Sequence, residues 1–258
     1  PTEINMSYLY DSPPQDFNYV RYSGFIQDNF RIRDSSGLTA SVGVRYNYST
    51  LNNEFILSPR IQIADKPKWQ RDIVFKFAAG VYAQPPFYRE MRDSIGNVNK
   101  NLLAQKSFHI VLGTDYNFKM YGRPFKVTGE LYYKSLWDLD TEGYNNIQVR
   151  SYAKNDATGY VYGGEVRLFG DLVKDATSWV SIGLMKAAYS STDDNFSGYT
   201  PMPTDQRFML GMYFEDYLPN NKNFKVHLNR MYSSGLPFGP PGKPAYADTL
   251  RMPAYKRV

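Results

Sequence analysis

The sequence predicts an all-β fold, an antiparallel transmembrane β-barrel to which this chain contributes about ten strands. Apolar and polar residues alternate with a period of two along most of the chain, which is the pattern of a two-faced strand. The links between the alternating segments are sorted by length. Aromatic residues make up 16% of the chain, with 23 Tyr and 16 Phe, although only 42% of it is hydrophobic. These three observations together favour a barrel in lipid over a soluble core.

Composition excludes several other classes. The chain has 258 residues and no cysteine, so neither a disulfide scaffold nor a thiolate zinc site is expected. No stretch approaches the ~18 apolar residues of a transmembrane helix. The 30 basic residues are interleaved with 25 acidic ones, without the basic run that marks a nucleic-acid-binding arm. The net charge of +5 therefore indicates a mixed solvated surface, and nucleic acid is not an expected partner.

The clearest strand is the segment 38–48, in which apolar or aromatic residues occupy every second position. Its length matches the ~9–11 residues that a tilted strand needs to cross a bilayer, whereas a soluble strand averages about 5–6. The same template predicts the other strands in order. They span residues 20–32, 58–63, 73–84, 108–119, 125–134, 160–168, 180–184, 207–215 and 224–229, the segment 180–184 being the weakest.

Charged residues fall in the middle of these strands on the polar face. They are Arg45, Arg60, Lys76, Asp115, Glu130, Glu165 and Arg167. A soluble sandwich would also alternate, with its polar face outward, so alternation does not decide between the two architectures. The links do: those at 33–37, 65–72, 120–124, 170–177 and 216–223 are compact. The others, at 85–106, 138–157, 190–206 and 233–254, are long, with 49–54 as the short exception. Short turns at one end and long loops at the other describe an outer-membrane barrel.

Several aromatic residues lie near predicted strand ends, where amphipathic rings favour the lipid headgroup level and form the two girdles of such barrels. They are Tyr19, Tyr22, Tyr46, Tyr48, Phe118, Phe125, Tyr133, Tyr160 and Phe224. Aromatic packing inside a soluble β-protein is the alternative for any one of them. Their joint placement near strand ends favours the girdles of a membrane barrel over packing inside a soluble protein.

A series of short strings resembles the C-terminal barrel of TonB-dependent outer-membrane receptors, in the form common in Bacteroidetes. The resemblance covers nearly the whole chain and depends on the order of the strings, since each alone is weak. They lie at residues 58–60, 80–90, 103–109, 130–134, 160–165, 203–207, 216–219 and 235–238, and include Pro203-Thr-Asp-Gln-Arg207 and Gly235-Leu-Pro-Phe238.

The resemblance implies a 22-stranded barrel plugged by an N-terminal domain, through which a pull by the periplasmic TonB complex drives nutrient uptake. This sequence departs from that pattern, because it shows about half the strands and neither a plug nor a TonB-contacting segment. The sequence starts at Pro1 without a basic n-region or an apolar h-region, so any signal peptide is expected to have been removed or to lie outside these residues. Tyr255 to Val258 resembles the opening of a further strand. Residues 1–258 are therefore expected to be part of a C-terminal barrel domain, with the TonB complex engaged by a missing N-terminal region. Closure of the ten strands as a small barrel is the alternative.

Sites for metals and catalysis are weakly indicated. The string Asp138-Leu-Asp140-Thr-Glu142-Gly143 matches the start of an EF-hand loop, but its twelfth position is Val149 instead of Glu, and an acidic extracellular loop is the preferred interpretation. Asp193 and Asp194 are expected at a solvated loop tip. His109 and His227 fall on the polar face and are expected to be hydrogen-bonded lumen residues. No nucleophile with an orienting base can be assembled, so no catalytic, metal or cofactor residue is predicted, and the protein is not expected to be an enzyme.

The expected function is uptake of a scarce nutrient, namely an iron chelate, a cobalamin, a glycan or a peptide. The expected partners are outer-membrane lipid, the TonB complex, the small nutrient and a surface lipoprotein, and the expected location is the outer membrane of a Gram-negative bacterium. The long loops, including 85–90 and 235–241, form the expected recognition surface, with Phe87, Tyr88, Tyr144, Tyr199 and Phe238 able to stack on a ligand or pack loop against loop. A passive porin-like or adhesin barrel is the alternative, and a soluble lectin-like sandwich is a weaker one.

Overall fold

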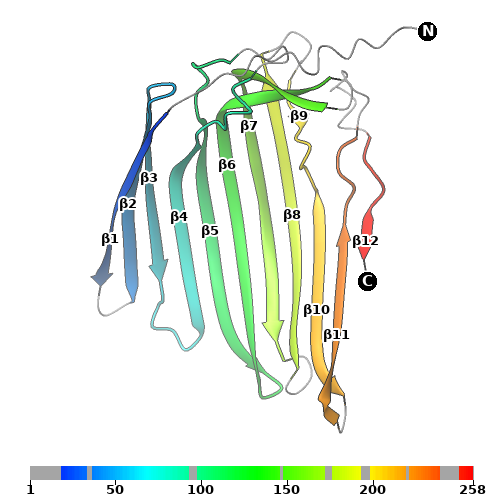
Figure 1. Cartoon of the computed structure of the whole chain (residues 1–258). Helices are drawn as coiled ribbons and strands as arrows, with labels where there is room; N and C mark the ends of the chain where they lie inside the picture. Colours follow the sequence, from blue (N-terminus) through cyan, green and yellow to red (C-terminus); the bar gives the residue numbers. More distant parts are fainter. Residues whose placement is uncertain are drawn as a thin grey trace, which may run out of the picture.

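The described part of the chain forms one antiparallel sheet in a computed structural model (Figure 1). The structure describes residues 19–33, 37–92, 98–145, 148–171, 176–192, 198–218, 221–238 and 250–257, with side chains described for all of these except 33, 141–152 and 222. The strands are β1 Arg21–Arg33, β2 Leu38–Ser49, β3 Glu54–Asp65, β4 Asp72–Gln84, β5 Gln105–Met120, β6 Arg123–Asn145, β7 Gln148–Gly170, β8 Thr177–Ser191, β9 Thr200–Pro201, β10 Phe208–Leu218, β11 Asn221–Ser233 and β12 Tyr255–Arg257.

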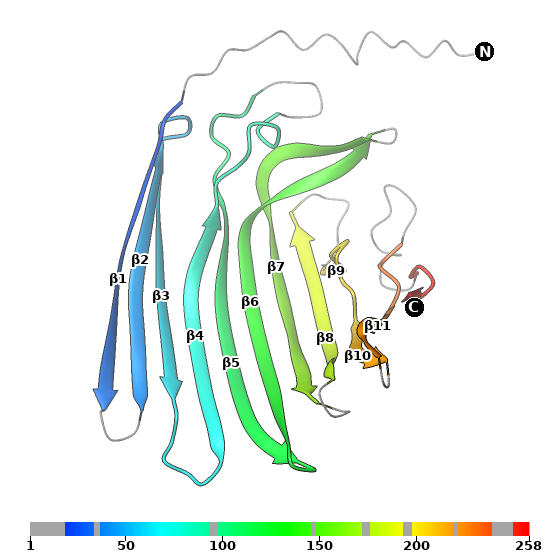
Figure 2. The same cartoon turned by 60° about the horizontal axis from the view of Figure 1, so that its bottom comes forward.

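Strand order follows chain order from β1 to β8 and then runs through β10, β11 and β12, while β9 pairs with the end of β8. Each strand thus pairs with its neighbour in the sequence, as in an up-and-down barrel wall. The sheet is curved and does not close on itself within the described residues: β1 and β12 are its two edges (Figure 2). The prediction of about ten strands is confirmed by the ten long ones, and the structure adds the two-residue β9 and the three-residue β12.

The antiparallel order places the links at opposite ends of the sheet. We call the end that carries the links β1–β2, β3–β4, β5–β6, β7–β8 and β10–β11 the turn end, and the opposite end the loop end. At the turn end, β5 and β6 are joined by only Tyr121 and Gly122, which both have positive φ values of 54° and 74°. A two-residue turn of this kind matches the twist of paired strands. The sorted link lengths seen in the sequence therefore correspond to the two ends of the sheet.

Substitution of Gly122 by alanine is expected to destabilise the β5–β6 turn by about 1–2 kcal/mol, the cost of left-handed backbone for a residue with a Cβ. No atom lies within 4 Å of the position that the new Cβ would occupy, so backbone conformation alone is tested. Gly183 has extended backbone, and a Cβ there would meet only Met209 Cε at 3.7 Å. Urea unfolding of the full-length protein in vesicles should show a lower midpoint for Gly122→Ala and little change for Gly183→Ala, and equal effects would contradict the assignment.

One predicted loop is wrong. Residues 138–157 were expected to be a long loop, but β6 and β7 continue as paired strands to Asn145 and Gln148. The pairing shifts register three times between Leu136 and Glu142, and Asp138 and Ala153 have positive φ values of 55° and 53°. Such irregularities bend a strand pair. Figures 1 and 2 show the ends of β6 and β7 turning away from the line of the other strands.

The pairing register sorts the side chains into two faces. Phe30, Ala40, Ile63, Phe77, Leu112, Leu131, Gly164, Leu184 and Phe208 form one continuous row across nine strands. We call the side of the sheet that carries this row the apolar face, and the other side the polar face. Leu112 is 53% exposed and Leu131 64%, so the described residues leave the middle of the apolar face uncovered. Asp28, Lys186 and Arg230 interrupt this face.

Aromatic residues gather at both ends of the apolar face. At the loop end, Tyr22 stacks on Tyr48 with ring centroids 6.5 Å apart, and Tyr46 stacks on Phe55 at 6.4 Å. At the turn end, Phe118 lies 5.7 Å from Phe125. Of the residues predicted to form girdles, Tyr22, Tyr46, Tyr48, Phe118 and Phe125 lie in these two bands, and the girdle role of the others stays a prediction.

The buried cluster of apolar side chains lies at the loop end, away from the middle of the sheet. Met91, Leu102 and Ala153 pack together with Leu51 and Val98 at its margin. No helix long and apolar enough to span a membrane occurs among the described residues. The sheet itself is held by its strand ladders.

Candidate functional site

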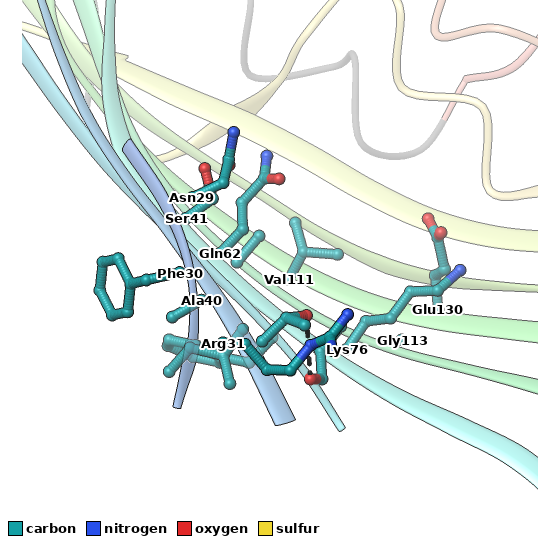
Figure 3. A pocket seen from close by; sticks show the side chains of 15 residues that line it. Asn29, Phe30, Arg31, Ala40, Ser41, Gln62, Lys76, Val111, Gly113 and Glu130 are labelled. Atoms are coloured by element: carbon teal, nitrogen blue, oxygen red, sulfur yellow. Dashed lines mark hydrogen bonds between the residues drawn. The ribbon is translucent and has the colours of Figure 1, made fainter. Parts of the chain in front are cut away.

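The polar face is the candidate functional surface, because it gathers the charged side chains of adjacent strands. Register places all seven predicted mid-strand charges there, which confirms the face assignment: Arg45, Arg60, Lys76, Asp115, Glu130, Glu165 and Arg167. His109 and His227 lie on the same face. The face is concave in Figure 3, where Asn29, Ser41 and Gln62 point to its inner side and Phe30 points away.

Near the turn end the charges on this face are paired. Lys76 Nζ donates to Asp115 Oδ2 at 2.6 Å, and Lys126 Nζ lies 3.2 Å from the same oxygen. Arg167 donates to Glu165 Oε1 at 2.7 Å. The Lys76, Lys126, Arg167 and Glu165 side chains are 42–47% exposed, and Asp115 is 15% exposed. Because solvent reaches one or both partners, each pair is worth about 1 kcal/mol or less. The arrangement maintains a hydrated, charged surface without fixing the fold.

A hollow of about 690 Å³ opens on the polar face between β1 and β6 (Figure 3). Its floor is formed by small side chains such as Gly113, which sits between Lys76 on β4 and Glu130 on β6. A Cβ at Gly113 would lie 3.5 Å from Lys76 Cβ and 3.6 Å from Glu130 Cγ. The glycine thus separates a positive from a negative side chain at the floor of the hollow, which is roomy enough for a small polar solute.

A second polar cluster joins β10 and β11. The Tyr213 hydroxyl donates to Glu215 Oε2 at 2.6 Å, and Lys225 Nζ donates to Glu215 Oε1 at 2.6 Å. His227 Nδ1 lies 3.1 Å from both the Tyr213 oxygen and Glu215 Oε2. His227 is therefore hydrogen-bonded as predicted. Its carboxylate partner was missed because Glu215 is on the neighbouring strand, where sequence spacing gives no signal.

At the loop end, an ion-pair cluster ties the β4–β5 link to the sheet. Lys106 Nζ lies 3.1 Å from Glu54 Oε1 and 2.8 Å from Asp138 Oδ2. Glu54 Oε2 also accepts a hydrogen bond from the backbone N–H of Ala104 at 2.8 Å. The Asn155 amide donates to the carbonyls of Leu103 and Asp138 at 3.0 and 2.7 Å. The link is thereby fixed to β3, β6 and β7.

A buried carboxylate holds two other links together. The Asp205 side chain is 0% exposed and accepts from the Ala187 N–H at 2.7 Å, from Arg207 at 2.6 Å and from Arg251 at 2.5 Å. Arg251 also donates to the Gly235 carbonyl at 3.3 Å. Burial raises the pKa of Asp205, but the Ala187 N–H and the two guanidinium groups outweigh it, so the pKa lies below its usual value. Arg251 thus connects the segments 203–207 and 235–238, although it lies in neither of them in the sequence.

The calcium-like string is part of the β6–β7 hairpin and not a loop. Asp138 pairs with Lys106, and Asp140 Oδ1 accepts from the Lys154 N–H at 3.0 Å. The side chains of Glu142 and Val149 lie outside the described ones, and Asp193 and Asp194 lie outside the described residues. The residues that the structure describes hold no group of three or more His, Asp or Glu side chains that could bind a metal.

The loop aromatics have mixed surroundings. Tyr88 lies under the Arg92 guanidinium, 4.8 Å from ring centroid to Cζ, and Tyr199 lies 5.0 Å from the Tyr160 ring. Phe87 and Phe238 are 63% and 55% exposed. The side chain of Tyr144 lies outside the described ones. His109 stacks on Tyr82 at 4.5 Å, and its Nε2 lies 2.8 Å from Ser107 Oγ, so it too is hydrogen-bonded.

No family model and no curated protein matches the sequence. Solved structures do resemble it. The FrpB iron transporter from Neisseria meningitidis (F3-3 variant) matches with a TM-score of 0.59 and 14% identity over 84% of this chain and 34% of its own. The copper transporter OprC matches at 0.61 and 12% over 92% of this chain and 39% of its own. The alcaligin outer-membrane receptor FauA from Bordetella pertussis matches at 0.52 and 15% over 84% of this chain and 40% of its own.

At these identities the likeness concerns the fold. The chain spans between a third and two fifths of the length of those transporters and receptors. Together with the two-faced sheet and the sorted links, the likeness establishes the fold of this chain as a section of an antiparallel transmembrane β-barrel wall.

Proposed function

We propose that the chain forms part of the wall of an outer-membrane receptor that takes up a scarce nutrient with energy from the TonB complex. The observation that carries the proposal is the two-faced sheet, which exposes an unbroken apolar row on one side and solvated ion pairs on the other. Only lipid outside and water inside satisfy both faces at once. The likeness to an iron transporter, a copper transporter and an alcaligin receptor supports uptake of a small solute.

The proposed unit is part of a C-terminal barrel domain spanning residues 1–258, of the form common in Bacteroidetes. The remaining strands, the plug and the TonB-contacting segment then belong to other parts of the full-length protein. The proposed location is the outer membrane of a Gram-negative bacterium, and a surface lipoprotein over the loop end is the proposed additional partner. The role proposed is transport without catalysis, of an iron chelate, a cobalamin, a glycan or a peptide.

Growth of a deletion strain tests the uptake proposal. Removal of the gene is expected to abolish or slow growth when one nutrient is limiting, in a panel that varies iron source, cobalamin, single glycans and peptides. A strain lacking TonB should show the same defect, because uptake through a plugged barrel requires energy. Normal growth across the panel would count against uptake, and a defect that is insensitive to TonB would favour the passive porin-like barrel.

A further inference from the structure

Near the loop end the polar face carries three basic side chains, Arg45, Arg60 and Lys134, with the His109 ring between them, and we call these four residues the basic patch. We propose that the basic patch binds an anionic solute that carries an aromatic or other planar ring. This inference rests on the proposed function and specifies its substrate class.

Register brings the patch together from four strands. Arg60 of β3 is opposite Gly80 of β4, Gly80 is opposite His109 of β5, and His109 is opposite Lys134 of β6. Three strand spacings of about 4.8 Å separate the backbones of Arg60 and Lys134, so their long side chains can reach one solute about 14 Å across or smaller. The patch therefore suits a small molecule.

The cations of the basic patch differ from the others on this face in their partners. Lys76, Lys126 and Arg167 are each in an ion pair with a carboxylate. Within the described residues, Arg45, Arg60 and Lys134 take part in none. Unpaired positive charges in a concave, partly enclosed surface attract and concentrate anions.

Ring surfaces line the same patch. The Arg60 guanidinium lies over the Tyr82 ring at 5.6 Å, and Tyr82 stacks on His109 at 4.5 Å. The Lys134 ammonium lies 5.5 Å from the Tyr132 ring centroid. Rings next to fixed cations bind a planar anion through stacking and charge together. The chemistry thus favours an anion with a ring over a simple inorganic ion.

A hollow of about 230 Å³ adjoins the patch between β1 and β3, with Arg45 and Arg60 on its walls and Gly43 at its floor. A Cβ on Gly43 would lie 3.2 Å from the Ile26 carbonyl oxygen, so a larger residue would crowd the floor. Both arginines line this hollow, and arginine binds a carboxylate or a similar oxyanion with paired N–H donors.

Calorimetric titration of the full-length protein in a nonionic detergent tests the inference. The probe is trimesate, a benzene ring with three carboxylates, and its neutral triamide is the control of the same shape. Trimesate is expected to bind and the triamide to bind at least about fivefold more weakly, the scale of one exposed charge pair. Raising the ionic strength from about 0.01 M to about 1 M shortens the screening length from about 30 Å to about 3 Å and should weaken trimesate binding further.

Substitutions of single residues test whether trimesate binds at the basic patch. Arg60→Gln and Lys134→Gln are each expected to weaken trimesate binding about fivefold, and Tyr82→Leu should weaken it for trimesate and triamide alike. Arg167→Gln removes the same charge from the same face outside the patch and should leave the affinity unchanged. A heat-modifiable band on an unheated gel would confirm that each variant folds, and the salt and triamide comparisons need no variant.

Equal binding of trimesate and triamide, or equal effects of Arg60→Gln and Arg167→Gln, would overturn the inference. A third outcome would also overturn it: the unmodified protein does not bind trimesate, and the double variant Arg60→Gln, Lys134→Gln has a lowered melting temperature. An acidic segment of the protein itself would then occupy the basic patch. The uptake proposal is tested separately, because its failure would appear as a deletion strain without a growth defect whatever the result of the binding measurements.

Discussion

Replacement of Leu112 by lysine is expected to destabilise the protein in lipid vesicles by about 2–4 kcal/mol, the cost of a charge at the middle of a lipid-facing strand. Leu112 lies at the centre of the apolar row between Phe77 and Leu131 and is 53% exposed in the sheet. Because the described residues leave Leu112 exposed, its surroundings, lipid or water, determine how much the lysine destabilises the protein. The free energy of unfolding in urea, followed by tryptophan fluorescence, measures the effect.

The matched control is Val111→Lys, one residue away on the same strand but on the polar face. Val111 lines the hollow of Figure 3, where a lysine side chain would enter water. We expect a change of less than about 1 kcal/mol, as for most surface substitutions. Equal destabilisation by both substitutions would mean that the two faces meet the same environment, which contradicts a barrel wall.

Substitution of Asp205 by asparagine is expected to release the β9–β10 link from the β11–β12 link at a cost of about 3 kcal/mol. Breaking a buried ion pair costs about 3–5 kcal/mol, and the lower end applies because Arg207 and Arg251 are partly exposed. Hydrogen exchange should show lost protection at residues 185–187, 202–208 and 234–238. Asp72→Asn, which removes an exposed pair with Lys66, should change stability by less than about 1 kcal/mol.

The same carboxylate makes the loop end sensitive to acid. The pKa of Asp205 is lowered in the folded state, so its contribution to stability is complete above the pKa of the unfolded chain. The contribution is lost as the pH falls through the lower folded-state pKa, because the protonated acid no longer attracts Arg207 and Arg251. After division by the intrinsic exchange rate at each pH, the protection of these links should therefore fall on acidification in the parent protein and not in Asp205→Asn. Acid sensitivity that survives the substitution would assign it to another group.

Sequence periodicity predicted the ten long strands and both faces because each crossing strand has lipid on one side and water on the other. The same reason explains why the sequence wrongly predicted a loop at residues 138–157, which are paired strands. Beyond the bilayer both faces of the β6–β7 hairpin meet water, so its residues no longer alternate, and the left-handed backbone at Asp138 and Ala153 has no glycine to signal it. At about 3.4 Å per residue, a 23-residue strand is far longer than the apolar band.

The polar clusters could not be predicted because they depend on register between strands. Asp115 and Lys76 are separated by 39 residues, and Asp205 and Arg251 by 46. The alternation indicated that Lys76 and Asp115 share a face, but not that they are neighbours. Arg251 lies outside any long strand, so no periodic signal pointed to its contact with Asp205.

Accessibility of a spin label along β5 tests the central claim most directly. The chain contains no cysteine, so single cysteines at residues 109–114 of the full-length protein, with any cysteines elsewhere replaced, can each carry a nitroxide. In vesicles, collision with apolar oxygen should peak at Ile110, Leu112 and Thr114, and collision with a water-soluble nickel chelate at His109, Val111 and Gly113. Nickel accessibility that is high at Ile110 and Leu112, or that rises and falls in phase with oxygen, would contradict a lipid-facing apolar face.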